Sequence, residues 1–328
     1  MQVSEGETRK LQAVGGGTVT VSLPKQWATE QGLDAGAEVN LYRHADGAIV
    51  VRGPDADAEA LTAVHVTVES DAPERVRRAL RATHDAGFET ATLSHASSFT
   101  DEQRRAARRV ATHLTGAEVR TTDEETIRLQ TLLDPRDVSV QQSVAQLRFL
   151  ALSVHREGTE AAVEGDADAD ERLADRAAAA ARLHRMVGRH LERSLVSLGE
   201  TDALGVSRPT LRDYAVAARA LDGVARQGVR IARAASSDPL PEDEAARVRA
   251  RASAARDAVD DATDAVFRDG DVAAAHDALD GASETVAAVD ETAAETPRGG
   301  RVLECLARTA GTGETIARAA LRADVREE

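Results

Sequence analysis

The sequence predicts a multidomain protein with a small all-β head, a small α/β middle domain and an all-α C-terminal part of two tandem three-helix bundles. Three patterns support this fold class. Two turn signals divide residues 8–52 into short alternating strands, and strand and helix patterns then alternate over residues 61–133. A helical period persists from residue 138 onwards, and 328 residues exceed the length of a typical single domain.

The head is predicted over residues 1–53. One pair of strands flanks the glycines at residues 15–17, and a second pair flanks residues 46–47, Asp-Gly, a strong hairpin signal. A short helix lies between them, with Pro24 in its first turn and Gly32 at its C-terminal cap. A unit this small buries little surface alone and leaves open strand edges. We therefore expect a homodimer in which strands of two chains interleave.

A short acidic linker, residues 53–60, leads to the middle domain, predicted over residues 61–133. The order is strand, helix, strand, helix and then two strands about a turn at residues 123–124, which is typical of a small α/β layer. Thr100 followed by Gln103 is the capping-box pattern, so the second helix is expected to begin there.

The remaining residues, 138–328, are predicted to be helical because apolar residues recur at intervals of three and four. Breaks rich in Gly, Pro and acidic residues separate the helices. The first three and the last three helices form two related units, at about 138–235 and 241–325. The helices are predicted over residues 138–163, 168–199, 208–235, 241–268, 271–292 and 298–323.

The charge of the chain restricts its partners. Lys and Arg number 41 against 56 Asp and Glu, and the formal net charge is −15. This argues against a generally basic nucleic-acid binder but allows a small binding module. Only Lys10 and Lys25 are lysines, and the other basic residues are arginines. The acidic, Arg-rich composition resembles that of halophilic proteins, in which molar salt screens the repulsion between carboxylates. A GC-rich codon bias is an alternative explanation, because it also favours Arg and Ala.

The sequence lacks the motifs that mark several classes of enzyme and metal-binding protein. No Gly-Lys-Ser/Thr follows the glycines at residues 15–17, and no Ser-His-Asp grouping or dinucleotide fingerprint occurs. The nine histidines are scattered without zinc-ligand spacing. We expect no enzymatic activity and no cofactor, and a packed, inert thiol at Cys305. Without an apolar stretch of membrane-spanning length or a hydrophobic signal region, the protein is expected to be cytoplasmic, with no membrane insertion.

The first part of the chain resembles a DNA-binding family. The AbrB/SpoVT swapped-hairpin domain is similar to residues 8–51, through GG-T-x-T-VSLPK-x-WA, then GL-x-x-G and a second hairpin. The resemblance implies a dimer with interleaved hairpins that binds double-stranded DNA. At high salt, directed hydrogen bonds would contribute more to binding than counterion release. The residues expected to contact phosphates are Arg9, Lys10, Thr18, Thr20, Lys25 and Arg43.

The helical part resembles two tandem PhoU domains, by its architecture and by patches such as SVHREGTEAAVEGDAD and LDGVARQGVRIA. Together with the head, the chain is similar to archaeal PhoU-type regulators. This implies a link to phosphate homeostasis and contact with a phosphate ABC-transporter component.

The PhoU family binds metal through an acid at position i and an Asp at i+4. Here Arg226 takes the second position after Asp222, and an arginine repels a cation. Metal is expected to bind weakly or not at all, and the acidic faces of the later helices are expected to be solvated. The weak candidate ligands are Asp175, Asp222, Asp280 and Glu284.

Two functions stay open at this point. One is a DNA-binding transcriptional regulator linked to phosphate uptake. The other is a signalling adaptor that controls a phosphate transporter by protein contact and uses the head only to dimerise. A metal-storing helical protein is a weaker third alternative.

Overall fold

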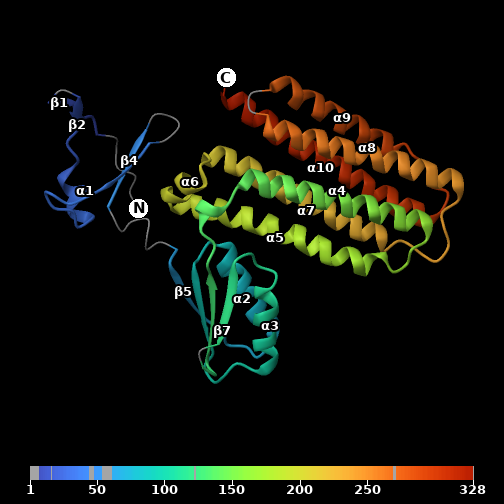
Figure 1. The fold of residues 1–328 in the computed structure, drawn as a ribbon, viewed down its shortest axis with the longest axis horizontal. Coiled ribbons are helices and arrows are strands. Elements are labelled where there is room, and N and C mark those ends of the chain that lie inside the picture. The colour runs from blue at the N-terminus through green and yellow to red at the C-terminus, as the bar shows by residue number, and fades with distance from the viewer. Residues whose placement is uncertain are drawn as a thin grey trace. The chain divides into compact units, whose positions relative to one another are not determined.

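The structure, a computed structural model of the chain, describes residues 7–15, 17–43, 48–53, 61–121, 123–268 and 271–327. The chain divides into two compact units, Met1–Glu59 and Ala60–Glu328. The first unit is the small β head, and the second contains a mixed sheet followed by long helices (Figure 1). The predicted order of a small β domain, a small mixed-sheet domain and a helical region is confirmed.

The head has two antiparallel hairpins and one short helix. Gly15 adopts a positive φ of 67°, which a glycine tolerates without strain, and the Gly17 N–H donates to the Gly15 carbonyl at 3.0 Å. The predicted turn at residues 46–47 and residues 54–60 of the linker lie outside the described residues. The elements are β1 (Gln12–Val14), β2 (Thr18–Thr20), α1 (Lys25–Glu30), β3 (Asn40–Arg43) and β4 (Ile49–Arg52).

The ends of α1 follow the predicted residues with one shift. Pro24 is the N-cap of α1, with an extended ψ of 128°, and does not lie in the first helical turn. The helical backbone angles begin one residue later, at Lys25, and an N-cap residue such as Pro24 keeps extended angles. Gly32 has a φ of 65° just after the helix, as a C-terminal glycine does.

The middle part is a four-stranded sheet in the order β5-β6-β8-β7. Strands β5 and β6 are parallel because α2 connects them, and the other pairs are antiparallel. α2 and α3 pack on the sheet around the buried Leu80, Leu93 and Phe99. The elements are β5 (Ala63–Thr67), α2 (Pro73–Asp85), β6 (Thr90–Ser94), α3 (Asp101–Ala111), β7 (Ala117–Thr121) and β8 (Thr126–Thr131).

The predicted capping box of α3 is confirmed. The Gln103 N–H donates to Thr100 Oγ1 at 3.2 Å, and the Thr100 N–H donates to Gln103 Oε1 at 2.9 Å. Both N–H groups would otherwise lack an acceptor at the start of the helix.

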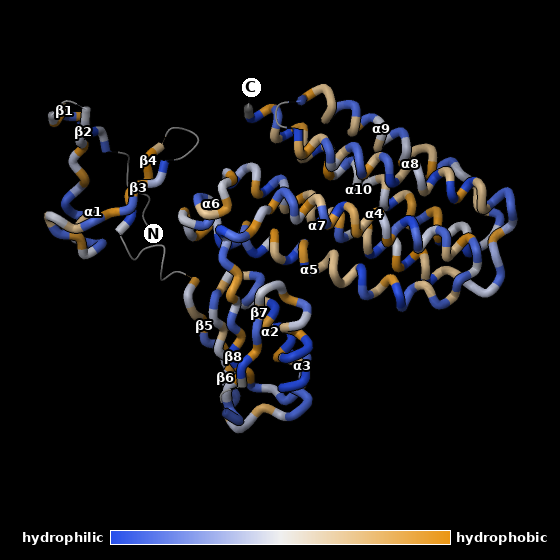
Figure 2. The backbone as a smooth tube through the Cα atoms, viewed as in Figure 1, coloured by the Kyte–Doolittle hydropathy of each residue, from blue (hydrophilic) through white to orange (hydrophobic). Residues whose placement is uncertain are grey.

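The helical part contains two sets of three mutually packed helices. α4, α5 and α7 form one set, α8, α9 and α10 form the other, and the sets meet through α7 with α10 and α4 with α8 (Figure 1). Hydrophobic residues recur along α4 and α7 between hydrophilic ones (Figure 2). The helices are α4 (Val140–Glu164), α5 (Ala169–Val196), α6 (Leu198–Leu204), α7 (Arg208–Ala232), α8 (Glu242–Phe267), α9 (Val272–Asp290) and α10 (Pro297–Glu327), after a 3₁₀ turn at Pro135–Asp137.

Three helix ends differ from the prediction by three or four residues. α7 ends at Ala232 rather than at residue 235, and α10 ends at Glu327 rather than at residue 323. α5 ends at Val196 rather than at residue 199, and the short α6 occupies most of what the sequence indicated was a break. Burial of Leu198, Glu200 and Leu204 holds this turn-rich segment in helical form, and Gly205, with a φ of 67°, ends it. Within the described residues, every helix is too short or too polar to span a membrane.

Candidate nucleic-acid interface

The β1–β2 hairpin has a polar face and an apolar face. Its register pairs Gln12 with Thr20 and Ala13 with Val19. Residues directly opposite each other share a face, and side chains alternate along a strand. Gln12, Thr18 and Thr20 therefore lie on one face, which is mainly polar but also carries Val14 opposite Thr18, while Ala13 and Val19 lie on the other.

The large apolar side chains of the head are exposed in the single chain. Leu11 is 69% exposed, and Val19, Leu41 and Ile49 are each 65% exposed. No residue of α1 is buried, and Gly53 alone is buried among the described residues of the head. The exposed set is Leu11, Val14, Val19, Val21, Leu23, Leu41 and Ile49. One chain therefore supplies almost no core to hold its hairpins together, and these surfaces need an apolar partner.

The structure brings some predicted DNA contacts together. Thr18 and Thr20 share the polar face of β2 with Gln12, which the sequence analysis did not select. The hydroxyl of Thr20 also donates to the Gln12 carbonyl at 3.4 Å. Lys10 lies two residues before Gln12 and is exposed. The signal that would have found Gln12 is its cross-strand position, which depends on the hairpin register.

The other predicted contacts are distributed over the head. Arg9 is ion-paired with Glu7, which partly neutralises its charge. Lys25 is the first residue of α1, and Arg43 ends β3 opposite Ile49, in a different sheet from Thr18. A single chain thus presents a compact polar face on β1–β2 and separate cations elsewhere.

The metal candidates do not converge. Asp222 is 2% exposed, ion-paired with Arg226 one turn along α7, and 3.5 Å from His184 Nδ1. Asp175 on α5 and Asp280 and Glu284 on α9 are exposed. In the described part of the chain, no three His, Cys, Asp or Glu side chains are grouped so that they could hold a metal ion.

Part of the acidic face of α8 is not simply solvated, contrary to expectation. Asp260 and Asp264 both form ion pairs with Arg148 of α4, so they link the two helix sets. Their i,i+4 spacing lets both carboxylates reach one guanidinium. His155 is fully buried, with its Nε2 3.1 Å from Thr309 Oγ1 on α10, so its ring packs inside the helical part.

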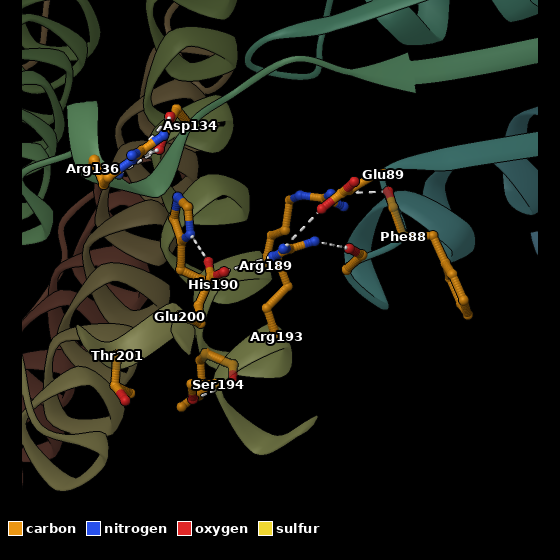
Figure 3. Close-up of polar contacts among 12 residues, drawn as sticks. Phe88, Glu89, Asp134, Arg136, Arg189, His190, Arg193, Ser194, Glu200 and Thr201 are labelled. Carbon is orange, nitrogen blue, oxygen red and sulfur yellow. Dashed lines mark hydrogen bonds and ion pairs between the residues drawn. The ribbon is translucent and has the colours of Figure 1, made fainter. Parts of the chain in front are cut away.

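A second polar site joins the sheet to the helices (Figure 3). Arg189 and Arg193, one turn apart on α5, reach the main chain where α2 ends. Arg189 donates to the carbonyls of His84 and, at 2.9 Å, Phe88, and Arg193 donates to the Gly87 carbonyl at 2.8 Å. The carbonyls at a helix C-terminus carry partial negative charge, so two cations stabilise this end of α2. We call this contact the α2–α5 joint.

Glu200 of α6 completes the α2–α5 joint. Its carboxylate accepts from Arg193 Nε at 2.8 Å and lies 2.6 Å from His190 Nδ1, and Glu200 and His190 are each 2% exposed. Burial by itself raises the pKa of Glu200, but the hydrogen bonds from His190 and Arg193 outweigh it and the pKa is lowered. Burial lowers the pKa of Arg189 to about 10, so it stays charged at neutral pH. The α2–α5 joint therefore holds the end of α2, next to the sheet, against α5 of the helical part.

The head matches a known family. The family model described as antidote-toxin recognition MazE, bacterial antitoxin, matches residues 12–54, which include both hairpins and α1. The head is therefore a MazE/AbrB-like N-terminal domain, and domains of this kind commonly dimerise and bind DNA. The match ends before the sheet and the long helices. No curated protein is similar enough to the chain to count as a relative.

Proposed function

We propose that the chain is a dimeric, DNA-binding regulator without enzymatic activity, whose β1–β2 hairpins contact DNA through their polar faces. The observation that carries this proposal is the amphipathic hairpin inside a MazE/AbrB-like domain. A second copy of the head would cover the exposed apolar side chains, which is the main favourable term in association. The polar faces would then point outward.

The chemistry of the polar face suits a phosphate backbone. Amide and hydroxyl side chains such as Gln12, Thr18 and Thr20 donate hydrogen bonds to phosphate oxygens, and Lys10 adds a cation beside them. Residues 1–53 carry five Lys or Arg against six Asp or Glu, whereas the remaining residues hold most of the net charge of −15. The near-neutral head is therefore the part of the chain that repels DNA least.

The helical part is proposed to carry a signal linked to phosphate uptake. Its two packed three-helix sets, α4–α5–α7 and α8–α9–α10, are in keeping with the PhoU resemblance of the sequence. The α2–α5 joint connects the first set to the sheet through Arg189 and Arg193, so a change in α5 would reach α2 directly. In this proposal the helices receive the signal or bind a transporter component.

The alternative is a signalling adaptor that acts by protein contact. The family description, antidote-toxin recognition, is of a protein-binding role, and the second unit is large enough to present a docking surface. In that case the head would only dimerise. The two functions differ in what the polar face of β1–β2 does.

Replacing Arg9 and Lys10 together by alanine is expected to weaken DNA binding at least tenfold while the dimer stays intact, because two cations near the phosphates are lost. Fluorescence anisotropy with promoter duplexes from the neighbourhood of the gene, against scrambled duplex, measures this in molar KCl. The matched control replaces Arg75 and Arg219, two exposed arginines of the second unit, and should bind as the wild type does. Unchanged affinity of the R9A/K10A variant would favour the adaptor.

Val19→Asp and Thr18→Asp test the two faces of one strand. Val19→Asp puts a charge on the apolar face and is expected to abolish both the dimer and DNA binding. Thr18→Asp puts the same charge on the polar face and should keep the dimer but lose DNA binding. Light scattering after size exclusion measures the mass, and anisotropy measures DNA affinity. A Val19→Asp variant that remains dimeric would show that this apolar face is not the interface.

A further inference from the structure

A groove runs between α4 and α8, where the two helix sets meet. Its volume is about 430 Å³, within the range of small-molecule sites. The residues that matter below are Arg148, Phe149 and Arg156 from one face of α4, and Arg256 and Asp257 from α8. This groove belongs to the second unit, whereas every DNA contact predicted above belongs to the first.

The three arginines of the groove differ in their partners. Arg148 is neutralised by the two aspartates of α8 described above. Arg156 and Arg256, by contrast, form no ion pair and no side-chain hydrogen bond with any residue that the structure describes, although Asp257 also lines the groove. Nη1 of Arg256 is buried without a hydrogen-bond acceptor in that same part of the chain. Two guanidinium groups at one groove thus have no side-chain acceptor among the residues that the structure describes, and one of them has a buried N–H.

The electrostatics of the pair favour an anion. Burial lowers the pKa of Arg256, the carboxylates of Asp257 and Glu160 oppose that shift, and the nearby charge of Arg156 adds to it. Keeping two like charges close together beside a partly buried groove is unfavourable unless a counter-charge lies between them. Guanidinium groups bind phosphate oxygens by paired, charge-assisted hydrogen bonds, and their planar geometry matches that anion.

The apolar wall of the groove points to a second part of the ligand. Phe149 is 68% exposed, although the chain contains only four phenylalanines. An exposed ring that lines the same groove as two arginines offers a face on which a planar group can stack. Leu152, one turn from Phe149 on α4, extends the apolar wall. Inorganic phosphate alone would leave this surface unused.

We propose that the α4–α8 groove binds a phosphorylated small molecule with a planar ring, such as a nucleoside monophosphate. The phosphate lies between Arg156 and Arg256, and the ring stacks on Phe149. The site touches both helix sets, so ligand binding would hold α4 and α8 together. This inference does not depend on DNA binding by the head.

Isothermal titration calorimetry on the full-length protein tests the site, in a chloride buffer free of phosphate and sulfate. The probes are adenosine monophosphate, ribose 5-phosphate, adenosine and inorganic phosphate. Saturable binding of adenosine monophosphate, one per chain, is expected. Each probe that lacks the ring or the phosphate should bind at least about tenfold more weakly, because it loses one of the two contacts. Failure of all four probes to bind at millimolar concentrations would overturn the proposal.

Single variants test which residues of the groove bind the phosphate and which bind the ring of the ligand. Arg156→Ala should weaken adenosine monophosphate about tenfold or more, and Arg156→Lys should weaken it less. Phe149→Ala should weaken adenosine monophosphate but leave ribose 5-phosphate unchanged. Both side chains are exposed, so neither change threatens the fold, and Arg219→Ala, an exposed arginine of α7, is the matched control. Wild-type affinity in the Arg156→Ala variant would exclude this groove as the site.

Discussion

Gly158→Ala is expected to lower the free energy of unfolding of the helical part by about 3 kcal/mol or more. α4 and α7 meet backbone to backbone at Gly158 and Gly228. A Cβ added at Gly158 would lie 2.1 Å from the carbonyl oxygen of Gly228, and one added at Gly228 would lie 2.7 Å from the Cα of His155. These neighbours are main-chain atoms, so a rotamer change cannot relieve the clash and a helix must shift.

The loss should appear as a lower midpoint in chemical denaturation followed by far-ultraviolet circular dichroism, which reports mainly the helices. Gly223→Ala is the matched control on α7, because nothing lies within 4 Å of a Cβ built there. Alanine is a better helix former than glycine, so the control should gain about 0.5–1 kcal/mol. Equal stability of the Gly158→Ala variant and the wild type would contradict the close approach of α4 and α7.

Elements specified by local signals were predictable. The hairpins of the head follow from strand alternation and glycine turns, and α3 follows from its Thr100–Gln103 box. The long helices follow from apolar spacing, since each must bury one face. These signals lie within a few residues of each other, so the sequence shows them without a tertiary context.

The candidate sites were less visible because their parts are far apart in the chain. Arg189 and Phe88, which meet in the α2–α5 joint, are 101 residues apart, and Arg148 and Asp260 are 112 residues apart. Neither pair leaves a motif. α6 was missed for another reason, since Glu200 is only seven residues from Arg193 and ten from His190. Its carboxylate meets these two side chains only when α6 folds back against α5, and no local pattern indicates that packing.

Glu200→Ala is expected to lower the free energy of unfolding by about 2–3 kcal/mol at pH 7. The change removes the buried carboxylate that pairs with Arg193 and His190 and leaves both groups short of an acceptor. The loss is smaller than for an isolated buried charge, because Arg193 keeps the Gly87 carbonyl and Glu89. Glu89→Ala is the control: it removes an exposed partner of the same arginine and should change stability by less than about 1 kcal/mol.

The effect of Glu200 should also depend on pH in a defined direction. The pKa of Glu200 in the folded protein is below its ordinary value of 4.5. A carboxyl of this kind contributes stability above the pKa of the unfolded chain and loses the contribution as the pH falls through the folded value. The difference between wild type and Glu200→Ala should therefore shrink as the pH falls below about 4.5. Denaturation series at several pH values measure it, and a difference that grows on acidification would contradict a charged Glu200 in the α2–α5 joint.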